Sequence, residues 1–179
     1  MSIARWAFIL ASAGLLSACF VSKGDLIAPK DADYPIASGT TLTVWKLDEA
    51  GRRKNETPGH AVVTRDGANY VYTETGEKPV TGLMKSAGGD DFIVLFHDQD
   101  HPGQSVYGLV RRSGDNWLSY GVTCPDFAKL AKAHGKSLAD FHTSDDGGNC
   151  AFMNYDDLKT AMLFLRANGK PDTEYAAGK

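Results

Sequence analysis

This chain of 179 residues has no marked excess of charge of either sign and no long apolar run. It carries 19 Lys and Arg against 22 Asp and Glu, and this near balance provides no basic surface for nucleic acid. Its most apolar stretch, residues 6–16, is shorter than the roughly 20 residues that a membrane-spanning helix needs. With 42% hydrophobic and 23% charged residues, the composition is typical of one globular domain and argues against a wholly disordered or polytopic membrane protein.

Motifs for several kinds of chemistry are also absent. The chain has no CxxC redox motif and no GxSxG turn of the kind that presents a serine nucleophile. Gly135-Lys136-Ser137 looks like the end of a phosphate-binding loop, but the glycine required five residues earlier is Leu130. We therefore predict no cofactor and assign no catalytic residue. A non-enzymatic protein is favoured, and a periplasmic enzyme with a dispersed active site, such as a hydrolase, is the alternative.

The N-terminal 18 residues have the pattern of an export signal. A single charge, Arg5, precedes the apolar run, and no acidic residue occurs. The run ends in Leu16-Ser17-Ala18-Cys19, which resembles the lipobox of bacterial lipoprotein precursors. The resemblance implies cleavage before Cys19 by signal peptidase II, attachment of diacylglycerol to its thiol, and fatty acylation, such as with palmitate, of the new N-terminus. The alternative is a secreted protein cut after Ala18, which leaves Cys19 as an unpaired thiol in an oxidising compartment.

A lipid on Cys19 determines the expected location. Two or three buried acyl chains anchor a protein stably, whereas one chain is marginal. The next residue, Phe20, is not the Asp that in this family commonly retains lipoproteins in the inner membrane, so the resemblance implies the periplasmic face of the outer membrane. Residues 19–38 lack helical or strand periodicity and are expected to tether a single domain over residues 39–179. The expected partners are the membrane and an envelope protein; the sequence does not indicate an oligomeric state.

The other two cysteines, Cys124 and Cys150, form an even set. After export they meet an oxidising periplasm, where a disulfide is the expected state. Closing a loop of about 26 residues stabilises a fold by about 3 kcal/mol when the loss of chain entropy is considered alone. Two cysteines without histidines at suitable spacing cannot complete a zinc site. We therefore predict a disulfide between them.

Turn signals divide residues 39–122 into short apolar or β-branched segments. The sharpest signal is Asp66-Gly67, a pair suited to a two-residue hairpin turn. About seven strands are expected in an antiparallel meander. Because apolar residues occur on both faces of several strands, the meander is expected to form a curled sheet or small barrel with both faces partly covered. The predicted strands are 41–47, 60–65, 69–74, 79–86, 92–97, 105–112 and 116–122.

After Cys124 the spacing of apolar residues becomes helical. Helices are predicted over about 125–134 and 155–168, and the chain from Asp172 onward is expected to fray. The predicted fold class is therefore α+β, mainly antiparallel β, with two C-terminal helices braced by the disulfide.

Two groups of residues are weak candidates for binding. His97, Asp98, Asp100 and His101 could ligate a metal, but Pro102 interrupts the similarity to a calcium loop, and a solvated hairpin loop without metal is favoured. Six aromatic residues could line a ligand cup, although packing in a small β core is their commoner use. They are Trp45, Tyr70, Tyr72, Tyr107, Trp117 and Tyr120.

These patterns favour a lipid-anchored envelope protein that binds rather than catalyses. Beyond the lipobox, the chain resembles small Gram-negative envelope lipoproteins only in general type. Such a protein could inhibit a secreted hydrolase, serve as an accessory subunit of an envelope assembly, or carry a small apolar ligand. A carrier predicts an open apolar cavity, an interaction module predicts an exposed apolar patch, and an enzyme predicts a pocket with clustered titratable groups.

Overall fold

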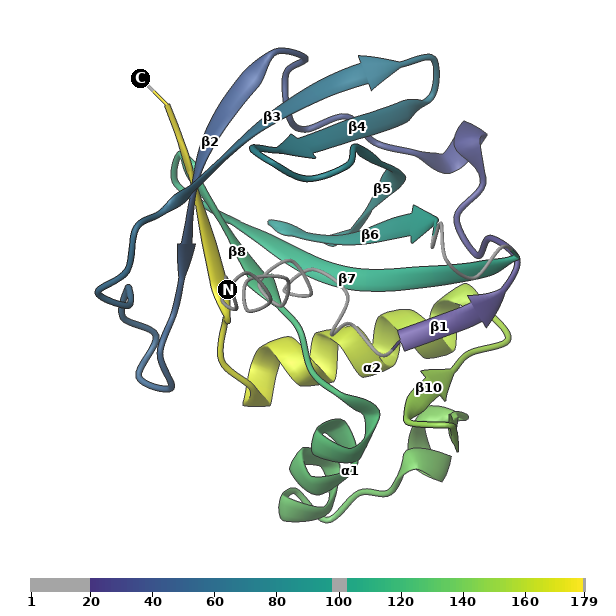
Figure 1. Ribbon diagram of the computed structural model, residues 1–179. Helices are drawn as coiled ribbons and strands as arrows, with labels where there is room; N and C mark the ends of the chain where they lie inside the picture. The colour runs from purple at the N-terminus through teal and green to yellow at the C-terminus, as the bar shows by residue number, and fades with distance from the viewer. Residues whose placement is uncertain (1–19, 98–102, 179) are drawn as a thin grey trace, which may run out of the picture.

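A closed antiparallel barrel forms the larger part of the computed structural model, which describes residues 20–97 and 103–178 (Figure 1). Seven strands, β2 to β8, follow one another in the chain as predicted, and β11 completes the barrel by pairing with both β8 and β2. β6 also pairs with β7, so the ring of strands is continuous. The barrel strands are β2 Thr40–Lys46, β3 Gly59–Asp66, β4 Asn69–Glu74, β5 Val80–Gly88, β6 Asp91–His97, β7 Gln104–Ser113, β8 Asn116–Tyr120 and β11 Thr173–Ala177.

The hairpin between β3 and β4 differs slightly from its prediction. Asp66 pairs with Asn69, so the two loop residues are Gly67 and Ala68, one position later than the predicted Asp66-Gly67 pair. Gly67 has φ +57°, a left-handed value that glycine adopts without steric cost. A turn with glycine at its first position needs only that one positive φ. The position of the turn follows from the strand register, because this register directs the apolar side chains of β3 into the barrel.

Several barrel strands bury apolar side chains on both faces. On β6, Val94 points into the barrel, whereas Ile93 and Leu95 point outward into a second core. The helix α2 (Tyr155–Asn168) lies along the outside of the barrel near β7 (Figure 1) and contributes apolar side chains, such as that of Leu158, to the second core. The apolar residues on alternating faces thus have the two-sided coverage that the sequence predicts.

The two C-terminal helices are confirmed close to their predicted bounds. At the start of α1 (Cys124–Ala133), the Thr123 hydroxyl accepts a hydrogen bond from the Asp126 N–H at 3.2 Å. At the start of α2, the side chain of Asn154 accepts one from the N–H three residues on, at 2.9 Å. Neither helix combines the length and the apolar character that crossing a membrane requires, and nor does any other helix in the described part of the chain. The remaining short elements outside the barrel are η1 Pro29–Asp31, η2 Leu138–Phe141, β9 Ser144–Asp146 and β10 Asn149–Ala151.

Residues 20–38, predicted to be a tether, are part of the fold. The strand β1 (Phe20–Lys23) pairs antiparallel with β7 and parallel with β10. The ring of Phe20 is 2% exposed and its centre lies 4.9 Å from that of Phe127 on α1, while Ile27 is fully buried. This part of the prediction is wrong because these apolar residues enter the core singly and so produce no period in the sequence.

The strand β11 is a second difference from the sequence prediction. The chain from Asp172 onward was expected to fray, yet Thr173 and Tyr175 are buried with their side chains among those of the barrel core. This segment is too short to show a clear strand pattern. Its conformation is stabilised by hydrogen bonds to neighbours on both sides, β2 and β8, which the local sequence does not reveal.

The predicted disulfide is confirmed. Cys124 at the first position of α1 is bonded to Cys150 on β10, and both residues are fully buried in the second core. The bond therefore ties the helical part of the chain to β10, which in turn pairs with β1 beside the barrel.

Replacing both cysteines by alanine is expected to lower the free energy of unfolding by about 3 kcal/mol, because the bridged loop regains its freedom in the unfolded chain. Urea unfolding in non-reducing buffer measures the change. The wild-type protein in reducing buffer is the control and should unfold like the variant. A loss below about 1 kcal/mol in both experiments contradicts a stabilising role for the bond.

Candidate ligand-binding site

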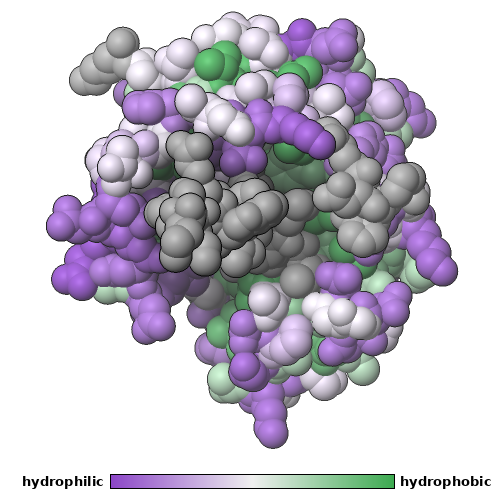
Figure 2. Space-filling view, in the orientation of Figure 1, coloured by the Kyte–Doolittle hydropathy of each residue, from purple (hydrophilic) through white to green (hydrophobic). Residues whose placement is uncertain are grey.

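The interior of the barrel holds a mainly apolar pocket of about 100 Å³ that is open to the surface. Inward-pointing side chains form its walls, because alternate residues of each strand face the barrel axis. Figure 2 shows hydrophobic residues at the bottom of a hollow in one face of the molecule. The wall residues include Leu42, Val63, Met84, Val94, Val110 and Trp117.

Two inward-facing glycines lie on this wall for different reasons. A Cβ at Gly82 on β5 would collide with the backbone carbonyl oxygen of Leu95, so the close approach of β5 and β6 requires glycine there. A Cβ at Gly108 on β7 would meet no atom within 4 Å. No neighbouring atom therefore prevents a side chain at Gly108, and its absence leaves room in the cavity.

The structure brings four of the six candidate aromatic residues to the cavity, namely Tyr70, Tyr72, Trp117 and Tyr120. The other two, Trp45 and Tyr107, point away from it.

The outward orientation of Trp45 and Tyr107 follows from strand alternation. Trp45 lies next to inward-facing Val44 on β2, and the guanidinium carbon of Arg53 lies 4.8 Å from its ring centre. Tyr107, on the outer face of β7, is fully buried in the second core, where its hydroxyl accepts a hydrogen bond from the Leu26 N–H at 2.8 Å. Sequence reasoning selected both residues by type and not by the face they occupy.

Asp172 is the one acidic residue among the described residues that line the pocket, which also include Ser119, Thr173 and four tyrosines. Its Oδ2 accepts a hydrogen bond from the Gly121 N–H at 3.0 Å. Its Oδ1 is buried and has no hydrogen-bond partner among the described residues. Burial raises the pKa of Asp172, while the Thr173 hydroxyl, the positive charge of Lys46 and the Gly121 N–H partly oppose that shift. Asp172 is therefore a largely buried carboxyl group beside the pocket, and its Oδ1 is not accessible from the open space.

Two tyrosines, Tyr72 and Tyr175, lie side by side on the wall of the pocket. The Tyr72 hydroxyl donates a hydrogen bond to Glu74 Oε2 at 3.1 Å, and the centres of the Tyr72 and Tyr175 rings are 6.2 Å apart. Burial is the main cause that raises the pKa of each phenol, and the nearby negative charge of Glu74 adds to it; for Tyr175 the charge of Asp172 contributes as well. Both phenols therefore stay neutral at physiological pH.

The N-terminal segment covers the barrel near the start of β4. The hydroxyl of Tyr70 donates to the carbonyl of Ile36 at 2.9 Å and accepts from its N–H at 3.0 Å. Nearby, the guanidinium carbon of Arg65 lies 3.6 Å from the centre of the Tyr34 ring. Glu74 stands at the other end of the same strand and does not line the pocket.

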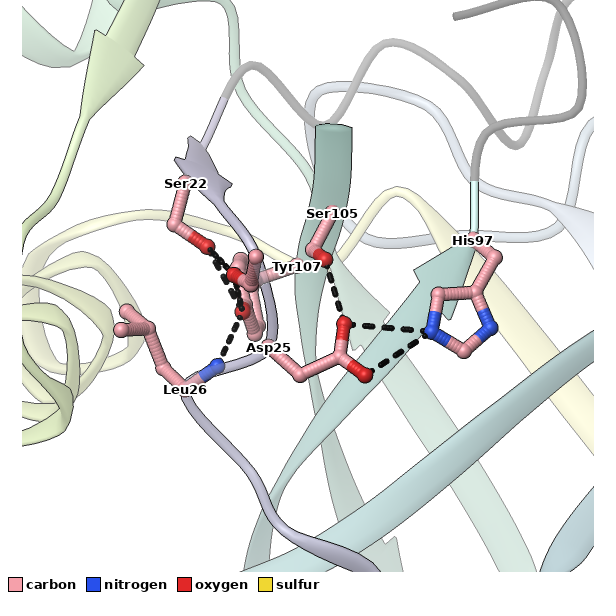
Figure 3. Close-up of polar contacts among 7 residues, drawn as sticks. Ser22, Asp25, Leu26, His97, Ser105 and Tyr107 are labelled. Atoms are coloured by element: carbon pink, nitrogen blue, oxygen red, sulfur yellow. Dashed lines mark hydrogen bonds and ion pairs between the residues drawn. The ribbon is translucent and has the colours of Figure 1, made fainter. Parts of the chain in front are cut away.

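The predicted metal candidates are only partly visible, because Asp98, Asp100 and His101 lie outside the described residues. His97, at the end of β6, has its Nε2 3.1 Å from both carboxylate oxygens of Asp25 (Figure 3). The described residues include no group of three or more His, Cys, Asp or Glu side chains placed to hold a metal ion.

The cluster around Asp25 also includes a serine but differs from a hydrolase triad. The Ser105 hydroxyl donates to Asp25 Oδ1 at 2.6 Å, and His97 contacts the same carboxylate (Figure 3). In a triad the imidazole, not the carboxylate, receives the serine proton. Burial raises the pKa of Asp25, but the hydrogen bonds from Ser105 and His97 bring it below its usual value overall. We interpret this cluster as a brace that joins the N-terminal segment to β6 and β7.

Sequence reasoning did not identify Asp172 or Gly108 as site residues. The alternation along β7 placed Gly108 on one face with its valine neighbours, but only closure of the barrel makes that face the wall of a cavity. Asp172 precedes a strand that closes the barrel through distant pairings, so its burial had no local signal.

The stability of the protein relative to an Asp172→Asn variant is expected to fall as pH rises from about 4, the usual aspartate pKa, through the raised folded-state pKa of Asp172. The folded-state pKa is raised, so the cost of the buried charge is absent at low pH and appears as pH rises through that pKa. Urea unfolding of both proteins across this range measures the difference. Asp146→Asn, at an exposed position, controls for loss of one charge, and a difference independent of pH contradicts burial of the Asp172 carboxylate.

The comparisons with known proteins assign no family to this site. No family model, curated protein sequence or solved structure matches the chain. The chemistry of the cavity is therefore inferred from its own residues.

Proposed function

We propose that this protein is a lipid-anchored envelope protein whose barrel binds and carries a small, largely apolar ligand. The observation that carries the proposal is the apolar cavity of about 100 Å³ inside a closed barrel. Eight-stranded barrels are either filled by side chains or hold one small ligand, and here the position of Gly108 leaves space open.

An empty apolar cavity destabilises a protein. Side chains that line such a space have no partner atoms on one side and so lose dispersion contacts. A single larger side chain at Gly108 would remove part of that cost without meeting another atom at its Cβ. A bound ligand offers the same compensation, because it restores contacts to the cavity wall. The open space inside the barrel therefore favours a carrier, because neither an inhibitor nor an accessory subunit needs such space.

The volume limits the size of the ligand. An engineered apolar cavity of about 150 Å³ in another protein admits benzene. The present pocket is smaller, so it takes only part of a short alkyl chain or of a single small ring, and the remainder would extend toward the hollow at the surface (Figure 2).

The proposed anchor is the lipid on Cys19, a residue outside the described part of the chain. Phe20 is already paired in β1 and buried in the second core. A lipid on Cys19 would therefore be attached one residue from the folded domain, which would keep the barrel close to the membrane surface. The resemblance to the lipobox supports this assignment, and with it the proposed location at the periplasmic face of the outer membrane.

A Gly108→Leu variant is expected to weaken binding of n-hexanol at least tenfold, because the new side chain occupies the space that the alkyl chain needs. Titrations followed by the amide NMR shifts of the purified protein measure the affinity. Val62→Leu is the matched control, since Val62 is 39% exposed, and its affinity should stay within about twofold of wild type. Unchanged binding by Gly108→Leu would show that the ligand lies elsewhere.

A Cys19→Ser variant is expected to lose lipid labelling and to accumulate as uncleaved precursor, because the thiol that accepts diacylglycerol is absent. Metabolic labelling with a fatty-acid analogue, followed by mass spectrometry of the N-terminus, tests this. A variant with Cys124 and Cys150 replaced by alanine is the control and should keep the label. Normal labelling of Cys19→Ser would refute the lipobox assignment.

A further inference from the structure

The strands β1 and β8 lie one after the other along the same edge of β7. Phe20 at the start of β1 pairs with Tyr107, whereas Tyr120 at the end of β8 pairs with Leu109. β6 occupies the other edge of β7 over this whole stretch, so β1 and β8 share one edge. The residue between the two pairs is Gly108, which lines the pocket. The barrel wall therefore passes from one strand to another at the glycine that leaves room in the pocket.

The pocket extends to this junction between β1 and β8. Tyr120 and Gly121, at the end of β8, line it together with Gly108. Beyond these residues the chain leaves the barrel and enters α1 at Cys124. Since Gly108 directly follows Tyr107, the partner of Phe20, the open space comes to within one residue pair of the start of β1.

The side chains of β1 alternate between the second core and the barrel side. Phe20 belongs to the second core, and the Ser22 hydroxyl lies 2.8 Å from that of Tyr107 on the same face (Figure 3). Val21 lies between them in the chain and pairs with Val106, which shares the face of Gly108 because it is two residues away on β7. Val21 is buried. An apolar group on the barrel side of β1 is therefore shielded from water.

The proposed lipidation site, Cys19, lies outside the described residues but directly precedes Phe20. Successive Cα atoms are about 3.8 Å apart, and paired strands are about 4.8 Å apart. An acyl chain is much longer than these spacings, so a lipid attached to Cys19 starts within reach of the space beside Gly108.

We infer that, when no membrane is present, the pocket takes part of an acyl chain carried by the protein's own Cys19. This inference rests on the proposed function, because it uses both the lipid anchor and the apolar pocket. A tethered chain competes well for the pocket, since attachment gives it a high effective concentration there. The proposed ligand and the proposed anchor are then parts of the same molecule.

A membrane is expected to empty the pocket again. The gain from apolar burial is roughly proportional to the area removed from water. A bilayer covers the whole acyl chain, whereas the pocket takes only part of one, so the chain leaves the pocket wherever a bilayer is available. The pocket is therefore blocked in water and open to other ligands at the membrane surface.

An alkyl group attached to the Cys19 sulfur tests whether a chain at this position reaches the pocket. The mature chain, residues 19–179, is purified without lipid; Cys124 and Cys150 are bonded to each other, which leaves Cys19 as its free thiol. Reaction with hexyl or methyl methanethiosulfonate then adds a six-carbon or a one-carbon group through a mixed disulfide. The S-methyl protein is the matched control, because it carries the same linkage without the chain.

The S-hexyl protein is expected to bind n-hexanol at least threefold more weakly than the S-methyl protein, because the tethered chain competes at an effective concentration on the order of millimolar. Before hexanol is added, its amide NMR shifts at pocket residues such as Val94 and Val110 should already move as hexanol moves them in the S-methyl protein. Gly108→Leu should abolish the difference between the two forms, and the exposed control Val62→Leu should keep it.

The natively lipidated protein in phospholipid nanodiscs tests release of the chain. The amide shifts of its pocket residues should match those of the S-methyl protein, because the acyl chains lie in the bilayer. Shifts that match the S-hexyl protein instead would refute release at the membrane.

The outcomes separate this inference from the proposed function. If the S-methyl protein binds hexanol and the S-hexyl protein binds it equally tightly, with unchanged pocket shifts, the inference is overturned and the carrier proposal stands. If the S-methyl protein does not bind hexanol, the carrier proposal itself fails.

Discussion

Closure of the barrel by β11 is the constraint on which the rest of the structure depends. This strand pairs with β2, the first barrel strand, and with β8, the seventh, so a segment near the C-terminus joins the two ends of the meander. Without it, β2 and β8 would be exposed edges and the apolar inner face would have no enclosed interior. The cavity exists because this pairing brings the inward faces of all the strands around one axis.

The same closure dictates where the helices lie. The chain between β8 and β11 must leave the barrel and return, and it does so over the outer face of the strands near β7 (Figure 1). There α1 and α2 cover apolar residues such as Leu95 and Leu109, and β1 adds Phe20 from the other end of the chain. These elements fill the outer core, whereas the pocket is lined mainly by inward-facing strand residues together with Ile36 of the N-terminal segment.

The return of the chain into β11 also positions the polar group of the cavity. Asp172 is the residue directly before β11, and its backbone is bonded to both β8 and the end of β2. Its carboxyl group is therefore carried to the barrel wall by the strand pairing, while Tyr70 and Ile36 occupy the opposite end.

Local patterns in the sequence determine the meander and the two C-terminal helices, because turn glycines, helix caps and apolar periods act over a few residues. The Cys124–Cys150 bond was also predictable, because these are the two cysteines that remain once Cys19 is assigned to the lipobox. Tertiary structure alone decides the features that depend on distant partners. One such feature is the formation of β1 and β11 as strands, since neither segment has a clear pattern of its own. The others are the inward orientation of Tyr72, the outward orientation of Tyr107, and the burial of the Asp172 carboxyl group. The four aromatic residues on the cavity were identifiable by type, but a cavity arises only when strands far apart in the chain enclose one volume and the residues facing it, such as Gly108, do not fill it.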